Sequence, residues 1–310
     1  MALWSSKIVS VKYSDRHNFW ALFRFIAGND LGLMKKSYLL FLLTALMAER
    51  AAGQVRRSRW QAGREIPPLG VIKLIGGGGL SYYQGDVRKT NDLTHIEPQV
   101  GFGFSYRLTE RVSVRSEVRF YRISGSQPTN VANTNNLSFR SDNPDGYLAA
   151  QVDLRRFNDR PRTNYYLFGG VGVTYLSPKA LYKNEWVSLP PLQTEKVAYA
   201  RTTLVLLAGV GVSYQVAQRW SLGVELSNNF STSDYLDDVS TVYPDPAGMT
   251  ERALALSDRR PEIGLGANQP GFIRGNPKAK DSYIFLSLKA EYLLANRAQA
   301  RAKRKLRCSY

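Results

Sequence analysis

Acid–base or nucleophilic chemistry in this sequence could begin from only a few side chains. Acyl transfer and hydrolysis usually need a histidine base beside a serine nucleophile. Beyond residue 53 the chain has a single histidine, His95, with Thr94 and Glu97 close to it in the sequence. A lone histidine in a polar loop is more often solvated or structural. The sequence therefore predicts no catalytic residue and no enzyme, with a lipid-modifying enzyme as an alternative.

Acidic residues gather at Asp234, Asp237 and Asp238, and carboxylate oxygens are ligands that Ca²⁺ prefers. Two bulky residues interrupt the spacing, and the ligand order of an EF-hand is missing. A loop turn or a contact with a partner protein is the better interpretation, so no metal site is predicted. The four glycines at 76–79 lack the lysine and the helix of a phosphate-binding loop. No cofactor is expected, and the glycines suit a bend or a close backbone approach in a strand.

The most regular chemical pattern is a set of charges at alternate positions of otherwise apolar segments. Eight of them are candidates for a lumenal ion-pair network: Arg115, Arg119, Arg155, Lys289, Glu117, Asp153, Glu225 and Glu291. The positions between them are apolar, as at Val114, Val118 and Phe120. Charges persist away from water only when they are paired. Four basic and four acidic residues therefore predict a polar interior crossed by ion pairs.

Such alternation indicates β-strands that have two different faces. It recurs in residues 69–83, 97–107, 112–124, 147–157, 165–176, 203–216, 220–231 and 282–294. Most of these segments are close to the roughly 9–11 residues that a tilted strand needs to cross a bilayer. Aromatic residues near the segment ends are expected to form interfacial girdles. They are Tyr82, Tyr83, Tyr106, Tyr165, Tyr214, Trp220 and Tyr292.

The connections between the segments alternate between short turns and long polar loops. Short turns at one end and long loops at the other are typical of bacterial outer-membrane barrels. We predict an all-β fold, an eight-stranded antiparallel up-and-down transmembrane β-barrel over residues 69–294, with its ends on the periplasmic side. A barrel of this size is filled by its own side chains, so we expect a plugged interior. A soluble, lipocalin-like barrel is the alternative.

Residues 34–53 have the order of a signal peptide. Two lysines follow Met34 and precede an apolar run that is too short to cross a bilayer as a helix. Cleavage after Gly53 would leave Gln54 as the first mature residue and 54–68 as a linker. Residues 1–33 show neither secretory order nor strand alternation. We interpret them as a doubtful leader before a true start at Met34, with a genuine extended leader as the alternative.

The chain is basic, with a formal net charge of +17, and ends in a basic tail at 295–310 that includes Arg301 and Arg304. No zinc spacing or recognition helix accompanies these charges, so no nucleic acid is expected as a partner. Anionic lipid head groups or an acidic periplasmic protein suit the tail better. A solvated end without a partner is the alternative.

Three segments, at 76–87, 234–243 and 274–285, carry a family resemblance. They read GGGGLSYYQGDV, DYLDDVSTVY and RGNPKAKDSYIF. Together they resemble the small outer-membrane barrels of Bacteroidetes, one branch of which is the barrel subunit of the type IX protein secretion machinery. The resemblance covers roughly residues 69–294. Family members usually end on an aromatic-rich last strand, whereas a basic tail follows here.

These features favour a non-enzymatic outer-membrane barrel that anchors or scaffolds a type IX protein secretion or cell-envelope complex. The expected partners are outer-membrane lipid and periplasmic or secretion-complex proteins. The candidate partner contacts are Asp234, Asp237, Asp238, Arg301 and Arg304. A solitary barrel for envelope stability or adhesion is the alternative.

Overall fold

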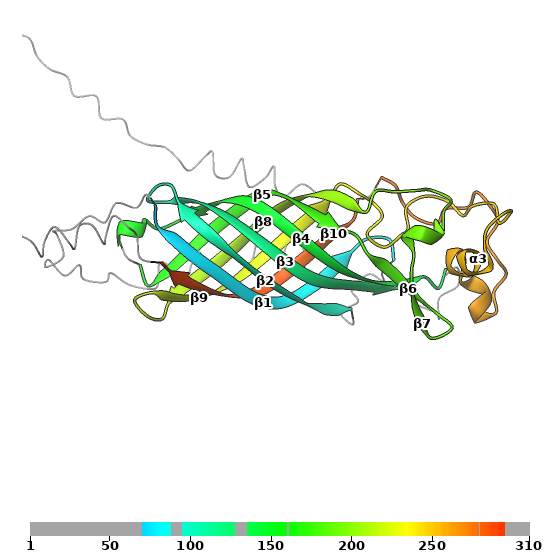
Figure 1. The fold of residues 1–310 in the computed structure, drawn as a ribbon, viewed down its shortest axis with the longest axis horizontal. Coiled ribbons are helices and arrows are strands. Elements are labelled where there is room, and N and C mark those ends of the chain that lie inside the picture. The colour runs from blue at the N-terminus through cyan, green and yellow to red at the C-terminus, as the bar shows by residue number, and fades with distance from the viewer. Residues whose placement is uncertain (1–69, 88–94, 128–134, 160, 279, 295–310) are drawn as a thin grey trace, which may run out of the picture. The chain divides into compact units, whose positions relative to one another are not determined.

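The computed structural model describes residues 70–87, 95–127, 135–159, 161–278 and 280–294. Within them, eight long strands pair antiparallel and close into a barrel (Figure 1). The barrel strands are β1 (Ile72–Gln84), β2 (Ile96–Arg107), β3 (Val112–Ser126), β4 (Ser138–Asp153), β5 (Thr163–Tyr175), β8 (Thr202–Gln215), β9 (Trp220–Ser231) and β10 (Ser282–Leu293). The predicted fold is confirmed.

Two strand pairs make the barrel a closed one. β1 pairs with β10 from Lys73 opposite Leu293 to Gln84 opposite Ser282. β3 pairs with β4 from Val112 opposite Val152 to Ser126 opposite Ser138. The structure thus begins β4 at Ser138, whereas the sequence pattern predicts residue 147. The difference arises because the outward positions of this early part are polar, which hides the apolar alternation.

The smaller elements lie mostly at the long-loop end of the barrel. The hairpin of β6 (Pro178–Tyr182) and β7 (Glu185–Ser188) adds to β4. Its two-residue turn places Lys183 and Asn184 at positive φ, as the twist of a tight hairpin requires. The other short elements are η2 (Phe157–Asp159), η3 (Pro190–Leu192), α3 (Glu251–Ser257) and η4 (Arg260–Ile263). Among the described residues no helix is long and apolar enough to cross a membrane.

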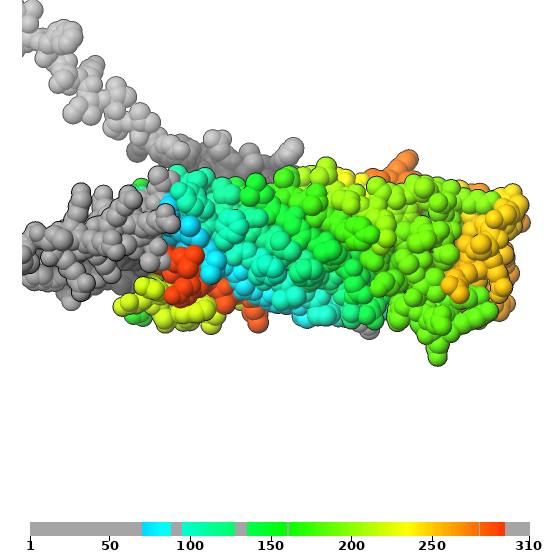
Figure 2. Space-filling model, in the orientation of Figure 1, coloured from blue at the N-terminus to red at the C-terminus, as the bar shows by residue number. Residues whose placement is uncertain are grey.

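We use the word cap for residues 176–201 and 232–281, the loops between β5 and β8 and between β9 and β10. Figure 2 shows the cap side chains, in green and orange, continuing the barrel wall at the long-loop end. Thr250 begins α3 by accepting a hydrogen bond from the Ala253 amide, as an N-cap does. Leu256, on the same helix, is 2% exposed and packs with Ala180 of β6. The cap is therefore a folded unit with its own core.

The outward face of the barrel is an apolar belt. Its exposed side chains include Val100, Phe102, Phe104, Leu148, Leu204, Leu206, Leu222 and Leu288. On β5 the belt runs between Tyr165 and Tyr175. Ten residues at about 3.3 Å each, on a strand tilted by about 40°, span about 25 Å, the height of an outer-membrane apolar band.

Aromatic residues gather at the short-turn end of this belt. Tyr214 and Trp220 are exposed, and the rings of Trp220 and Tyr292 lie 4.9 Å apart. Tyr83 does not belong to the girdle, contrary to the prediction, because its side chain points into the barrel and is 1% exposed. The apolar belt and its aromatic border place the protein in the outer membrane.

Candidate functional site in the barrel lumen and its cap

The centre of the lumen is an ion cluster built from three strands. Arg115 of β3 donates from Nη1 to Glu225 Oε1 of β9 at 2.7 Å, and its Nη2 bonds Glu117. Lys289 Nζ of β10 lies 2.5 Å from Glu117 Oε2. The Tyr166 hydroxyl donates to Glu225 Oε1 at 2.8 Å. Because these side chains are at most 5% exposed, the charges can persist there only through their mutual bonds.

Further ion pairs lie on both sides of this cluster. Arg119 donates to both carboxylate oxygens of Asp145, at 2.8 and 2.6 Å. Its guanidinium also lies 4.5 Å from the centre of the Tyr147 ring, within range of a cation–π contact. Towards the short-turn end, Arg107 pairs with Asp153 at 2.5 Å. Lys73 pairs with Glu291 at 2.7 Å. Side chains therefore fill the described lumen from one end to the other.

The structure brings seven of the eight predicted lumenal charges into the interior. Arg155 is the correction. It lies beyond the end of β4, where its Nη1 donates to the Thr163 carbonyl at 3.4 Å. The strand ends at Asp153, so the alternation that would have turned Arg155 inward no longer applies.

The set of eight predicted lumenal charges omits three interior charges, Lys73, Arg107 and Asp145, although the alternation along residues 97–107 puts Arg107 on the polar face. Lys73 and Arg107 lie at strand ends, and Asp145 falls in the part of β4 that the pattern assigns to a loop. Each of them is an even number of positions away from an inward-facing residue of the same strand, and this spacing could have identified them. With them, the described lumen pairs five basic with five acidic side chains.

A second buried ion pair organises the cap. Arg274 Nη1 donates to Glu195 Oε1 at 2.9 Å and to the Asp238 carbonyl at 2.7 Å. Glu195 also accepts hydrogen bonds from the backbone amides of Ser240 and Thr241. Because Glu195 precedes β8 and Arg274 precedes β10, the pair joins the two long loops into one unit.

The three clustered aspartates are part of the cap core. Asp238 accepts from the Thr194 and Tyr199 hydroxyls, each at 2.5 Å, and Asp234 accepts from Ser240 Oγ at 2.7 Å. Asp237 accepts from the amide of Val239. All three are at most 3% exposed. The interpretation of Asp234, Asp237 and Asp238 as partner contacts is therefore wrong, because all three side chains are buried inside the protein.

No cluster of carboxylate, histidine or cysteine side chains in the described ranges is arranged to hold a metal ion. Burial instead raises the pKa of Asp237 to about 7 and the pKa values of Asp234 and Asp238 to about 6. Burial, together with the negative charge of Asp237, also raises the pKa of Asp281.

Asp237 and Asp281 share one hydroxyl. The Tyr83 hydroxyl oxygen lies 2.6 Å from Asp237 Oδ2 and 2.9 Å from Asp281 Oδ1. A phenol has a single proton to donate. The second contact is a hydrogen bond only if one of the two carboxyls is itself protonated, which agrees with the raised pKa values of both aspartates.

His95 lies between the start of β2 and the end of β3, next to two serines. Its Nε2 lies 2.7 Å from Ser126 Oγ and its Nδ1 lies 3.5 Å from Ser124 Oγ. Ser124 Oγ donates to Glu97 Oε1 at 2.8 Å. The sequence did not reveal this group, because the serines are some thirty positions away along the chain.

The remaining sequence-based predictions lie outside the described residues. They concern the leader at 1–33, the signal peptide at 34–53 with cleavage between Gly53 and Gln54, the linker at 54–68, and the basic tail at 295–310 with Arg301 and Arg304. They stay predictions.

Comparison with known proteins gives likeness in fold. No protein-family model and no curated protein matches the sequence. Among solved structures, the chain is similar to Neisserial surface protein A, at 10% identity and a TM-score of 0.38, over 72% of this chain and 97% of that one. It is similar to Ail, the attachment invasion locus protein of Yersinia pestis, at 10% identity and a TM-score of 0.38, over 73% and 99%. It is also similar to OprG from Pseudomonas aeruginosa, at 11% identity and a TM-score of 0.38, over 74% of this chain and 99% of that one. At identities and TM-scores this low, no other property of these proteins is assigned to this chain.

Proposed function

We propose that this protein is a non-enzymatic outer-membrane anchor that scaffolds a type IX protein secretion or cell-envelope complex. The observation that carries the proposal is the combination of a plugged lumen with a folded cap. The ion pairs of Arg115 and Arg119 occupy the space that a solute would need. A rigid barrel that ends in an ordered platform suits the presentation of a binding surface.

The outer surface of the cap offers such a surface. Ile273 is 78% exposed and Phe272 is 54% exposed, beside the partly exposed Val242. They are held in place, because Val242 and Ile273 form a β-bridge and the Tyr243 amide donates to the Phe272 carbonyl. Large exposed apolar groups on a fixed backbone mark protein interaction sites. We assign the partner-binding face to these three residues.

Co-purification tests the proposal. The tagged protein is extracted from outer membranes in mild detergent, and the co-eluting proteins are identified by mass spectrometry. The variant Ile273→Asp should lose the partner, while Val197→Asp, a matched apolar-to-acid change elsewhere on the cap, should keep it. A barrel that is recovered alone, at any detergent strength that leaves it folded, would support the solitary adhesion or stability role instead.

The basic tail supplies a separate test on the opposite side of the membrane. Deleting residues 296–310 should reduce recovery of an acidic periplasmic partner while leaving the barrel inserted. The attraction should weaken as salt rises, since the Debye length is only about 8 Å at physiological ionic strength. Unchanged recovery after the deletion would make Arg301 and Arg304 part of a solvated end.

One observation favours a second candidate function, the hydrolysis of lipid esters. His95 Nε2 lies 2.7 Å from Ser126 Oγ, within the reach of a base for a nucleophile. Ser126 Oγ would attack the acyl carbonyl, its proton would pass through His95 to the leaving alcohol, and water would release the fatty acid. Purified protein is incubated with phospholipid in mixed micelles. Fatty acid released by the native chain but not by Ser126→Ala would replace the anchor proposal.

A further inference from the structure

The barrel wall has an interrupted ladder between β2 and β3. Their pairing runs from Arg107 opposite Ser113 to Gln99 opposite Tyr121 and stops there. Both strands continue, β2 against β1 and β3 against β4. The next residue of β2 is Pro98, which has no N–H to donate to a neighbouring strand. The Ser81 hydroxyl of β1 lies against the carbonyls of both separated strands instead, at Glu97 and Arg122, and can donate its one proton to either.

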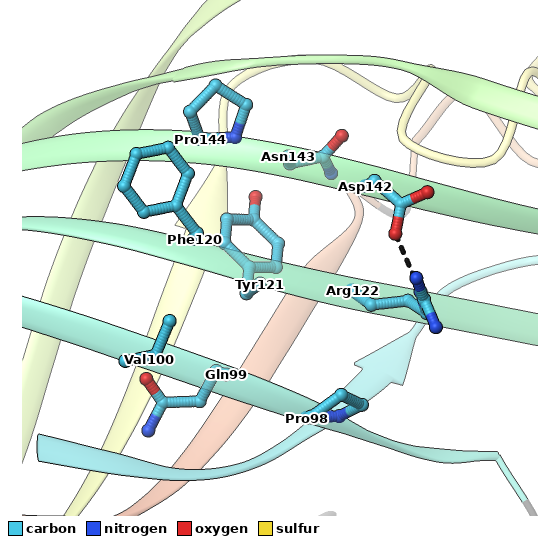
Figure 3. A pocket seen from close by; sticks show the side chains of 9 residues that line it. All are labelled: Pro98, Gln99, Val100, Phe120, Tyr121, Arg122, Asp142, Asn143 and Pro144. Carbon is cyan, nitrogen blue, oxygen red and sulfur yellow. Dashed lines mark hydrogen bonds and ion pairs between the residues drawn. The ribbon is translucent and has the colours of Figure 1, made fainter.

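A groove of about 330 Å³ opens beside this interruption. Figure 3 shows that its lining comes from β2, β3 and β4 and includes Val100, Phe120, Pro98 and Pro144. Phe120 and Val100 belong to the lipid-facing belt, each about half exposed. Gln99 contributes to the floor of the groove, but its side chain is 4% exposed and points into the lumen, where Nε2 donates to Ser287 Oγ at 2.8 Å. The walls of the groove that face outward are therefore mainly apolar.

A cluster of cations borders the groove where the apolar belt ends. Arg122 Nε bonds Asp142 Oδ1 at 2.6 Å, as the dashed line in Figure 3 marks. Arg140 and Lys179 approach the same carboxylate at 3.8 and 3.9 Å. The three cationic side chains are each about one-third exposed. One carboxylate cannot neutralise three cations, so excess positive charge faces outward there.

The order of residues along β3 sets the level of this charge. Phe120 and Arg122 are successive outward positions of one strand, about 7 Å apart. The apolar face of β3 ends at Phe120, and the charged part begins at Arg122. Arg140 also lies 5.2 Å from the centre of the Trp186 ring, an aromatic type that favours membrane interfaces. The cations therefore lie at the level of lipid head groups, on the long-loop side.

We propose that the groove and its cation cluster bind a phosphorylated lipid of the outer leaflet. The phosphate lies among Arg122, Arg140 and Lys179, where charge-assisted bonds to a phosphate are strong. An acyl chain lies along Phe120 and Val100. A phosphorylated lipid matches both halves of the site, because it carries its negative charge next to its apolar chains.

Lipid retention tests this proposal with the full-length protein purified in uncharged detergent. The probes are diphosphorylated lipid A, dephosphorylated lipid A and inorganic phosphate, and bound lipid is counted by native mass spectrometry. The native protein should retain the phosphorylated lipid. The double variant Arg122→Gln/Lys179→Gln should retain about tenfold less, as the loss of about 1.4 kcal/mol implies. Arg252→Gln, which removes a cation from α3 on the cap, should retain as much as the native protein.

The variant Phe120→Ala tests the apolar half of the site. Its side chain faces lipid, so its removal leaves the barrel folded, and heat-modifiable migration on gels checks this. The Phe120→Ala variant should retain less of the phosphorylated lipid. The extent to which inorganic phosphate displaces the bound lipid should stay the same as in the native protein. Three results would overturn the proposal: equal retention by the double variant, equal retention of dephosphorylated lipid A, or full displacement by inorganic phosphate at comparable concentration.

Discussion

Arg274 and Glu195 form a buried ion pair across the two longest loops of the chain. Their side chains meet at 2.9 Å and are each 2% exposed. Seventy-nine positions of sequence separate them, and the whole of β8 and β9 lies between them. The pair therefore holds the cap together from inside, where neither charge can turn to water.

Replacing Arg274 by alanine should open the cap. The change leaves the Glu195 carboxylate buried without its cation, at a cost of about 3–5 kcal/mol. Limited proteolysis should then cut within residues 232–281, while heat-modifiable migration shows that the barrel is intact. Lys183→Ala removes an exposed partner of Glu251 and should leave the cleavage pattern unchanged. Resistance of the Arg274 variant equal to that of the native protein would show that the cap does not depend on this pair.

Replacing Glu117 by glutamine should destabilise the barrel. Arg115 and Lys289 would lose their shared carboxylate, at a cost of up to about 3–5 kcal/mol for a fully desolvated pair. The temperature at which heat modification occurs should fall. Glu110→Gln, in an exposed turn, should cost no more than about 1 kcal/mol. The double variant Glu117→Gln/Lys289→Gln should lose less than the sum of the two single changes. An unchanged transition in the Glu117 variant would mean that water reaches this face.

Cap stability should depend on pH through Asp237. Its pKa is raised to about 7 in the folded protein, above the value of about 3.9 in an unfolded chain. The folded state then holds a proton that the unfolded state releases. The stabilisation is complete below about pH 4, decreases as pH rises towards 7, and is constant above that. Proteolysis of the cap should accelerate over this range. Asp237→Asn should make the profile less steep, and the part that comes from Asp234, Asp238 and Asp281 should remain. Asp142→Asn, which lies outside the cap, should leave the profile unchanged. A cap that becomes more resistant to proteolysis as pH rises would contradict the assignment.

An arginine in place of Leu288 should impair membrane insertion. Leu288 is 66% exposed in the middle of the belt, where an arginine costs about 2–4 kcal/mol at the bilayer midplane. The variant should show less folded protein in the outer-membrane fraction and a lower midpoint on refolding into vesicles. Ile273→Arg, at a still more exposed position of the cap, should insert normally. Equal insertion of both variants would argue against lipid contact at Leu288.

The barrel could be predicted from the sequence because its two environments force a period of two. On β2, outward Phe102 and Phe104 meet lipid while inward Gly101 and Gly103 leave room for the long side chains of β3, Arg119 and Glu117. Beyond the belt this constraint ends. Residues such as Asp142 and Arg140 then follow no apolar pattern, which is why the start of β4 and the inward Asp145 could not be predicted.

The cap could not be predicted, because its contacts join residues that are far apart in sequence. Asp238 looks like an exposed loop carboxylate until Thr194 and Tyr199 are brought against it. The same holds for His95, whose serine neighbours lie on another strand. Local pattern carries information about the faces of a strand, but not about which loops fold over one another.

The ladder between β1 and β10 determines the order in which the molecule can assemble. Every hydrogen bond between these strands must wait until the last barrel strand has been delivered, and such long-range pairings form slowly. Until then β1 has an open edge that could accept a strand from another chain. Glycine at position 77 lets β10 approach closely, since a Cβ there would lie 2.2 Å from the Leu288 carbonyl oxygen. The pairing that closes the wall is therefore the last to form, and an assembly factor that guards the β1 edge would act at this step.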